Sequence, residues 1–464
     1  MKPEGGNHQT QIGGSSVGSA LESLGYKQEL NRTMSGTDVV VYGLIYMVPM
    51  APVAVFGFIS NFSFGMTALV YVVAAIAMTF SAFSYKEMAQ RYPVAGSVYS
   101  YVRFGINGHV GYLAGWAILL DYLLLPALLA VFAASAMTGL WPAVPVWAWV
   151  VLFVLAATFI NLGGIALTAT VNKIFLGIQL VVITIFVAAV GLDVLTGEAT
   201  LSFTPFYNAD NFSWAIVFGA IPIAALSFIG FDAISTLNEE ARGGGQAVSR
   251  ATLIVLVVVT ALFILQVYLA SIYVPAGTIF MDGEDANNAF YMIAGQVVGD
   301  WFRVVVTLTS ALIAIFANSI ASMATSSRLV FSMARDRQLP SVLAGISEKR
   351  RAPRNAIVLI ATLSLLIGIF GSENQTLLTT LVTFGALTAY ILLNIAVLLR
   401  FGLIERSQRW FMHWVSPVVG TGLLCYALWH ADPHAKVLGI VWMLIGVVVA
   451  LGFYFSDRPE RDEG

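Results

Sequence analysis

Charged residues are scarce in this sequence of 464 residues. Only 10% of the side chains are Asp, Glu, Lys or Arg, whereas 58% are hydrophobic. A soluble domain carries roughly 25% charged residues, so too few are present here to cover a water-facing surface. Most of the surface is therefore expected to face lipid, and the backbone must then form helices or a closed barrel to satisfy its polar groups.

Short segments of alternating polarity, which mark the strands of a membrane barrel, are also lacking. The apolar runs are instead continuous and about 20 residues long, the length of a membrane-spanning helix. The sequence therefore predicts an all-α integral membrane protein with twelve spans. The predicted spans are 39–60, 66–86, 108–139, 145–162, 173–195, 213–238, 251–274, 303–333, 355–371, 376–400, 414–430 and 437–456.

Residues that carry out chemistry are rare as well. The single cysteine, Cys425, excludes an intramolecular disulfide framework, and its apolar run predicts a buried core thiol. The five histidines lie in tails, loops or span ends, and no metalloprotease, phosphate-loop or metal-ligand spacing is present. The sequence thus predicts no enzyme, no metal, no cofactor and no nucleic-acid partner.

The basic residues lie almost entirely on one side of the predicted spans. If the N-terminus is cytoplasmic, 21 Lys and Arg fall on the inner side, and only Arg303 and Lys436 fall outside. Because positive residues accumulate on the cytoplasmic side, both termini are predicted to be cytoplasmic. The polar, Gly- and Ser-rich residues 1–35 predict a disordered cytoplasmic tail without a cleavable signal peptide.

The predicted outer loop 275–300 is acidic. Its acidic residues are Asp282, Glu284, Asp285 and Asp300. Such a loop either concentrates cations at the outer surface or is an ordinary solvated loop. Within it, residues 286–298 are apolar but too short to span a membrane, so they predict an external half-helix.

The first and sixth predicted spans contain residues that interrupt a helix. In the first span, Pro49 and Pro52 each remove a backbone donor and clash with the preceding turn. In the sixth, Gly230 follows Pro222 and lies centrally. Unwound backbone is tolerated in a membrane only where it lines a protein cavity. Breaks at matching places five spans apart therefore point to a transport site, and a pair of ordinary proline kinks is the alternative.

Asp121 lies near the middle of the third span, where an isolated charge is costly. No basic residue lies in this span or at the centre of another, so a cationic ligand is one candidate for its counter-charge. The alternative is a carboxylate that is held by hydroxyls, or protonated, for structure or proton coupling. Tyr46, Trp116 and Tyr122 lie at similar depth, and aromatic faces attract ammonium groups, although most aromatics in such a chain belong to the core or the membrane belt.

Asp232 follows the break in the sixth span by two residues. It is a candidate either for capping or gating, or for contact with a second ammonium group. Glu239 and Glu240 lie nearer the cytoplasmic end and are expected to face Lys or Arg in a gate. Asp38 is expected to cap the first span, since negative charge is favourable at a helix N-terminus.

Polar residues gather in the eighth span. They are Asn318, Ser319, Ser322, Thr325, Ser326 and Ser327. They either line the site, complete an ion site, or form hydrogen bonds between packed spans, and these alternatives remain open. Phe228 and Phe231 flank the break in the sixth span and are candidates for a lid or wall.

Two predicted cytoplasmic motifs resemble those of a known superfamily. KEMAQRYPVAGSVYSYV, residues 86–102, is similar to the loop between spans two and three of amino acid–polyamine–organocation (APC) transporters, and SRLVFSMARDRQLP, residues 327–340, is similar to the loop after span eight. The resemblance covers residues 36–455. It implies the LeuT-type fold, with two inverted repeats of five spans and two further C-terminal spans. The implied divisions are 36–200, 201–402 and 403–456, followed by a cytoplasmic tail over 457–464.

Within this superfamily the chain resembles bacterial putrescine importers, on the stretches GLIYMVPMAPVAVFG, HVGYLAGWAILLDYLLLP, LSFIGFDAISTLNEE and TFGALTAYILLNIAVL. Amino acid members usually carry a Gly-Ser-Gly type of run at the first break, whose N–H groups would hold a substrate carboxylate. Here residues 47–52 replace that run, and two prolines lack N–H groups. Some proton-coupled relatives carry a lysine in span five where this chain has Gln179, so proton coupling through that lysine is in doubt.

Together these features predict alternating-access import of a small protonated amine, putrescine first, across a bacterial-type cytoplasmic membrane. The predicted binding residues are Tyr46, Pro49, Asp121, Tyr122, Phe228, Gly230, Phe231, Asp232 and Asn318, and the predicted gating residues are Glu239 and Glu240. An amino acid or monoamine permease or exchanger is one alternative, and a substrate-binding sensor without net transport is another. The coupling ion, proton or sodium, and the oligomeric state stay open.

Overall fold

The computed structural model describes residues 34–92, 97–163, 169–239, 241–275, 277–281, 283–335, 339–346 and 353–456. Within these ranges the chain is almost entirely helical, and one isolated bridge joins Met34 to Ala241. The predicted tails, apart from residues 34 and 35, lie outside the described residues. So do 93–96 and 336–338, which belong to the two loop motifs.

All twelve predicted spans coincide with helices. In the described part of the chain, ten helices are long and apolar enough to cross a membrane. Two shorter apolar helices, α7 (Val146–Leu162) and α9 (Trp214–Phe228), fall at the fourth span and in the first part of the sixth. The continuous α-helical spans are α4 (Thr67–Arg91), α6 (Gly108–Leu140), α8 (Ala169–Thr196), α10 (Gly244–Ser271), α14 (Arg354–Gly371) and α17 (Pro433–Ser456).

Three spans contain π-helical segments, which often occur at functional sites. The eighth span consists of α12 (Asp300–Leu308), η3 (Thr309–Phe316) and α13 (Ala317–Arg335). The tenth consists of α15 (Gln375–Val397) and η5 (Leu398–Ile404), and the eleventh of η6 (Phe411–Val415) and α16 (Ser416–His430).

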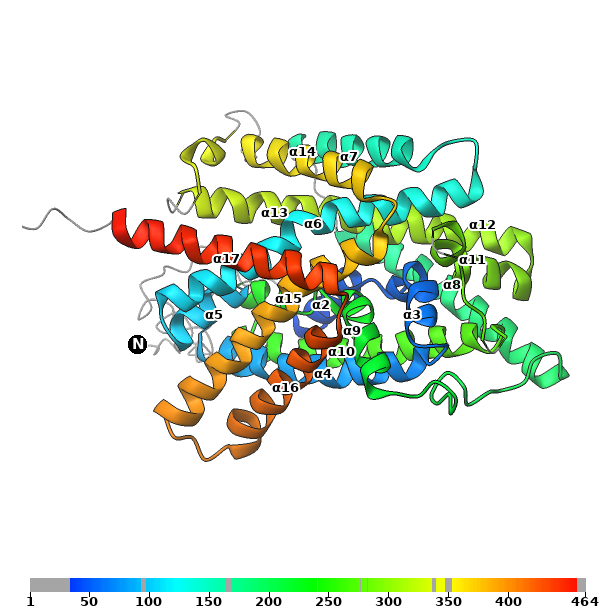
Figure 1. Ribbon diagram of the computed structural model, residues 1–464, viewed down its shortest axis with the longest axis horizontal. Coiled ribbons are helices and arrows are strands. Elements are labelled where there is room, and N and C mark those ends of the chain that lie inside the picture. Colours follow the sequence, from blue (N-terminus) through cyan, green and yellow to red (C-terminus); the bar gives the residue numbers. More distant parts are fainter. Residues whose placement is uncertain are drawn as a thin grey trace, which may run out of the picture.

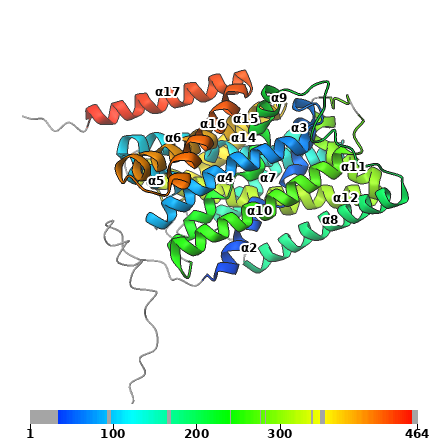
Figure 2. The same cartoon turned by 90° about the horizontal axis from the view of Figure 1, so that it is seen from below.

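The long helices lie side by side in one bundle, with the C-terminal end of α17 at the left of Figure 1 and α11 (Glu284–Val298) at the right. α10 packs along α4, and α15 packs along α6. Figure 2 shows α8 and α17 at opposite edges of the molecule. These outer helices expose aliphatic side chains such as Leu192 and Val448, as expected of surfaces that contact lipid.

The first span is broken at the predicted place. α2 (Gly36–Met47) ends at Val48, whose φ of 50° is unusual for a β-branched residue. The chain continues as a short 3-10 helix, η1 (Ala51–Ala54), and then as α3 (Phe56–Phe62). Gln266 of α10 holds the break, since its Nε2 donates to the Pro49 carbonyl at 2.8 Å.

The sixth span is also broken at the predicted place. α9 ends at Phe228, Gly230 has a φ of 119°, and the chain resumes as a 3-10 helix, η2 (Asp232–Glu239). A Cβ on Gly230 would lie 2.8 Å from Cδ1 of Tyr46. The two breaks therefore face each other in the middle of the bundle, where Figure 1 shows α2, α3 and α9.

The structure also tests several smaller predictions. Asp38 and Ser35 form a reciprocal capping box at the start of α2, so the predicted cap is confirmed. Residues 286–298 lie within α11, as the predicted half-helix requires. The prediction of a buried Cys425 was wrong: the residue is exposed on α16, because this peripheral helix buries only part of its surface, and the apolar run here also contacts lipid. The short helix α5 (Ser97–Gly105) was not predicted.

Candidate functional site

The two helix breaks border a small cavity of about 50 Å³. Tyr46 and Val48 line it from the first break, and Leu226 and Ile229 line it from the second. The wall also includes Leu125 and Phe132 of α6, Ile315 of the π-helical segment and Asn318 of α13. The cavity is mainly apolar, so polar recognition depends on the few groups at its edge.

Asp121 lies on α6 one turn before the cavity residue Leu125. Its side chain is buried, with 3% exposure, and Oδ1 has no hydrogen-bond partner among the described residues. None of the ion pairs in the described ranges includes Asp121. The predicted lack of a basic partner is therefore confirmed for the part of the protein described. A buried carboxylate oxygen without a donor is costly, so Oδ1 is suited to a positively charged donor.

Asp232 is also buried, but its surroundings differ. Its Oδ1 accepts hydrogen bonds from the backbone N of Gly230 and from Oη of Tyr390, both at 3.2 Å. The first bond stabilises the break before η2, but it is not a cap of η2, because Gly230 precedes the helix. Capping, gating and ligand contact stay predictions for Asp232. Asp121 packs against Gly385 of α15, the helix whose Tyr390 binds Asp232, so the two buried carboxylates lie against the same helix.

The backbone beside Asp121 is held by a hydroxyl from the eighth span. Pro126 lacks an N–H and so leaves the carbonyl of Tyr122, four residues earlier, without its helical donor. Oγ of Ser326 donates to that carbonyl at 2.5 Å. Ser319 likewise donates to the carbonyl of Pro126 at 3.4 Å. For these two serines, the structure shows the hydrogen bonds between packed spans that were one of the predicted alternatives.

The structure places some predicted residues away from the cavity. Phe228 is fully buried and packs its ring on Phe263 and Tyr71. Phe231 packs on Tyr390, with ring centroids 5.2 Å apart. Glu240 lies outside the described residues, and so does the side chain of Glu239.

Trp116 packs against the last helix. Its ring stacks on Trp442 of α17 at 4.7 Å, and each indole nitrogen donates to the other residue's carbonyl, at 2.8 and 2.9 Å. Among the aromatics first placed near Asp121, Tyr46 lines the cavity, whereas Tyr122 is not among the lining residues.

Two residues near the site escaped the sequence reasoning. Gln266 fixes the Pro49 carbonyl and Tyr390 holds Asp232. Both are polar residues in the middle of predicted spans, the seventh and the tenth, and intramembrane polarity was the signal that could have identified them.

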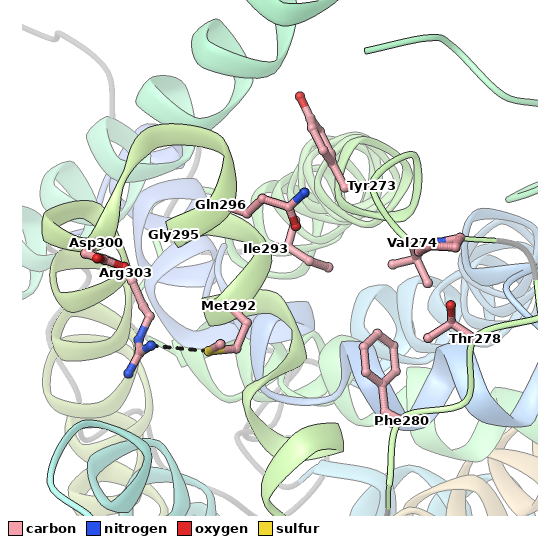
Figure 3. Close-up of a pocket in the computed structure, with 11 residues that line it drawn as sticks. Tyr273, Val274, Thr278, Phe280, Met292, Ile293, Gly295, Gln296, Asp300 and Arg303 are labelled. Carbon is pink, nitrogen blue, oxygen red and sulfur yellow. Dashed lines mark hydrogen bonds between the residues drawn. The ribbon is translucent and has the colours of Figure 1, made fainter. Parts of the chain in front are cut away.

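A separate pocket of about 430 Å³ lies between α11, α12 and the segment after α10 (Figure 3). In it Nη1 of Arg303 lies 3.4 Å from the sulfur of Met292. Burial, and then the hydrogen bond to the carboxylate of Asp193, raise the pKa of Tyr273 at its rim. Arg303 and Asp300 both line the pocket, so its charge favours neither cations nor anions, and no residue of the two breaks belongs to it.

Comparison with known proteins identifies the family. The model of the amino acid permease family matches residues 34–453. The chain belongs to this family. The permease is 33% identical to the low-affinity putrescine importer PlaP of Escherichia coli (strain K12), over 90% of this chain and 93% of the relative. The predicted APC membership is thereby confirmed.

The names of other relatives refer to different solutes. The permease is 25% identical to the branched-chain amino acid permease BcaP of Bacillus subtilis (strain 168), over 84% of this chain and 86% of the relative. It is 24% identical to the methylthioribose transporter of the same strain, over 92% and 95%. The permease is thus a transporter rather than an enzyme, and a multi-pass inner-membrane protein. Its family membership leaves the solute undecided.

Proposed function

We propose that the permease imports a small protonated amine, putrescine first, by alternating access. The observation that carries this proposal is the buried Asp121 carboxylate, whose Oδ1 has no partner among the described residues. An ammonium group supplies both the missing donor and the missing positive charge. The 33% identity to a putrescine importer supports the same substrate class.

Asp121 is the main amine ligand in this proposal, and Asp232 is secondary. Asp232 already accepts two hydrogen bonds, so it attracts the second ammonium of a diamine mainly through its charge. The aromatic faces of Tyr46 and Tyr122 attract the same cation, and Asn318 contributes a polar group at the cavity wall. Carbonyl groups near Pro49 and Gly230 accept further N–H groups, because an unwound segment leaves acceptors unpaired.

The backbone of the breaks supports an amine without a carboxylate. Pro49 and Pro52 offer no N–H, and the N–H of Ala51 donates to the carbonyl of Val48 at 2.8 Å. At the second break, the N–H of Gly230 already donates to Oδ1 of Asp232. A substrate carboxylate would therefore meet few free donors here, and a negative charge would face two carboxylates.

We further propose that the chain has the repeat organisation and the membrane orientation that its sequence predicts. Residues 36–200 and 201–402 form the two repeats, 403–456 the last two spans, and both termini are cytoplasmic. At the cytoplasmic end of the first span, Lys173 lies 3.9 Å from Asp38, as expected of an inner gate that breaks when the site opens inward. Glu239 and Glu240 are assigned to the same gate.

Uptake of labelled putrescine into proteoliposomes tests the proposal. Asp121→Asn keeps the shape of the side chain but removes its charge, and we expect uptake at low putrescine to fall at least about tenfold, because a hydrogen bond to a charged group contributes roughly 1.5–3 kcal/mol. Asp210→Asn, on an exposed loop, is the matched control and keeps normal uptake.

Undiminished uptake by Asp121→Asn would remove this residue from the site. Competition by amines and amino acids separates the alternatives. A substrate that must carry a carboxylate would favour an amino acid permease, as the name of the relative BcaP suggests. Binding without any flux would favour a sensor.

A further inference from the structure

A third cavity, of about 680 Å³, lies at the end of the bundle where α3, α6, α11 and α15 approach one another. Ser135 of α6 lines it, 14 residues beyond Asp121 on the same helix. At 1.5 Å per helical residue, the cavity lies about 20 Å from Asp121 along α6. It shares no lining residue with the small cavity between the helix breaks, although Phe132 of that cavity lies only one turn before Ser135 on α6.

The charged side chains of this cavity are acidic. Glu373 and Asp432 line it, and no Lys or Arg is among its lining residues in the described ranges. Glu373 is exposed, whereas Oδ1 of Asp432 accepts from the backbone N of Ala435 at 2.9 Å. Nδ1 of the exposed His434 lies 3.8 Å from Oδ1 of Asp432. Because no Lys or Arg lines the cavity in the described ranges, its concave surface still attracts cations.

A buried amide points to a ligand with donors. Gln375 lines the cavity and is only 4% exposed. Its Nε2 donates a hydrogen bond to Oγ of Ser135 at 2.6 Å, but its Oε1 has no partner among the described residues. Oδ1 of Asn287, another lining residue, is also unpaired. The wall of the cavity thus contains two buried acceptors that have no donor in the described part of the protein, and buried acceptors require donors.

The rest of the wall suits an organic cation rather than a bare ion. Phe58 and Phe62 of α3 line the cavity together with Trp147 of α7. Trp147 and Phe62 are exposed large hydrophobic residues. Aromatic faces attract ammonium groups and cover the methylene chain between them.

We propose that this cavity is a second binding site, which holds a small organic diammonium ion before it moves to Asp121. The identity of the cation and the outer position of the cavity rest on the proposed function and orientation. The site is weaker than the central one, because Glu373 is exposed and exposed ion pairs contribute little.

A cysteine-protection experiment tests this site in intact cells. Thr376→Cys places a thiol in the cavity wall, in a Cys425→Ala background that removes the natural cysteine. The probe is a membrane-impermeant cationic methanethiosulfonate, and the competitor is putrescine. Asp210→Cys, outside the cavity, is the control thiol.

We expect putrescine to slow labelling at position 376 but not at position 210. The protection should persist when Asp121→Asn is added, and Glu373→Gln should weaken it about threefold, as expected for an exposed charge. Sodium chloride at equal ionic strength and neutral 1,4-butanediol should protect much less.

Loss of protection in Asp121→Asn would overturn the second site, because the effect would then come from the central one. No effect of Glu373→Gln, or equal protection by sodium, would also overturn it. Normal putrescine uptake without protection at 376 contradicts the second site alone. Protection at 376 without any uptake contradicts the proposed function alone.

Discussion

Gly230 is the residue that brings the two helix breaks together. Its φ of 119° favours glycine, and its Cα faces the ring of Tyr46 so closely that no Cβ fits. Gly191 of α8 differs, because a Cβ there would meet nothing within 4 Å. The two glycines therefore form a matched pair for testing whether the contact between the breaks matters.

We expect Gly230→Ala to destabilise the protein by about 1–3 kcal/mol, through backbone strain and the clash with Tyr46, and to reduce uptake strongly. Gly191→Ala, in a helix, should be neutral or slightly stabilising. Thermal unfolding in detergent and uptake in proteoliposomes measure both effects. Equal behaviour of the two variants would show that the close contact at Gly230 is not required.

At this scale the sequence was informative where a residue was unusual for its depth. Asp121 was identified because a charge in the middle of a span is rare, and its lack of a basic partner is confirmed within the described residues. The partners of Asp232 could not be predicted, because Tyr390 lies 158 residues away in sequence. Cys425 was assigned to the core because an apolar run does not distinguish lipid contact from burial.

Among the elements, α6 combines the features that the site needs. It carries Asp121 and contains Pro126, which frees the carbonyl of Tyr122 for Ser326. Gly385 of α15 lets the two helices approach closely, since its Cβ position lies 2.6 Å from the carbonyl oxygen of Ala117. The helix is thus fixed on two sides next to its buried carboxylate.

We expect Ser326→Ala to lower the stability of the protein by about 1–3 kcal/mol, because the carbonyl of Tyr122 is then left without a donor in a buried site. Ser327→Ala is the matched control, since Ser327 is also buried but donates to Ala324 within its own helix. We expect its effect to be smaller. Unfolding temperatures of the two purified variants check this, and a larger loss in Ser327→Ala would contradict the assignment.

The breaks in the first and sixth spans were predictable, since proline and glycine act locally on the backbone. The way in which the breaks are held was not, because Gln266 reaches Pro49 from another span. The π-helical segment 309–316 has no local signal in the sequence either, although Ile315 within it lines the cavity.

At the scale of the whole molecule, an ionic cluster around the buried Glu87 joins distant parts of the chain. Glu87 of α4 is bound by Arg409 through two hydrogen bonds, at 2.7 and 2.9 Å, and by Nε2 of His413 at 3.0 Å. Glu87 and His413 are both buried. The cluster ties the second span to the start of the eleventh.

Removing Arg409 leaves the buried Glu87 without its main counter-charge, and we expect Arg409→Ala to cost about 1.5–3 kcal/mol, because the Arg409 side chain is itself 53% exposed. Arg91→Ala breaks an exposed pair with Glu405 and should cost less than about 1 kcal/mol. Fluorescence-detected size-exclusion chromatography after heating compares the thermal stabilities of the two variants. Similar stability of both variants would show that the cluster is not a structural link.

The contact between Trp116 and Trp442 has a practical consequence. Because each indole donates to the other residue's carbonyl, α6 and α17 are held in one register. A fluorophore on the exposed side of α17 therefore reports the position of the helix that carries Asp121, without occupying the cavity. Paired with a second dye on α2, it gives single-molecule energy transfer a fixed reference point from which the movement of the broken helices can be measured.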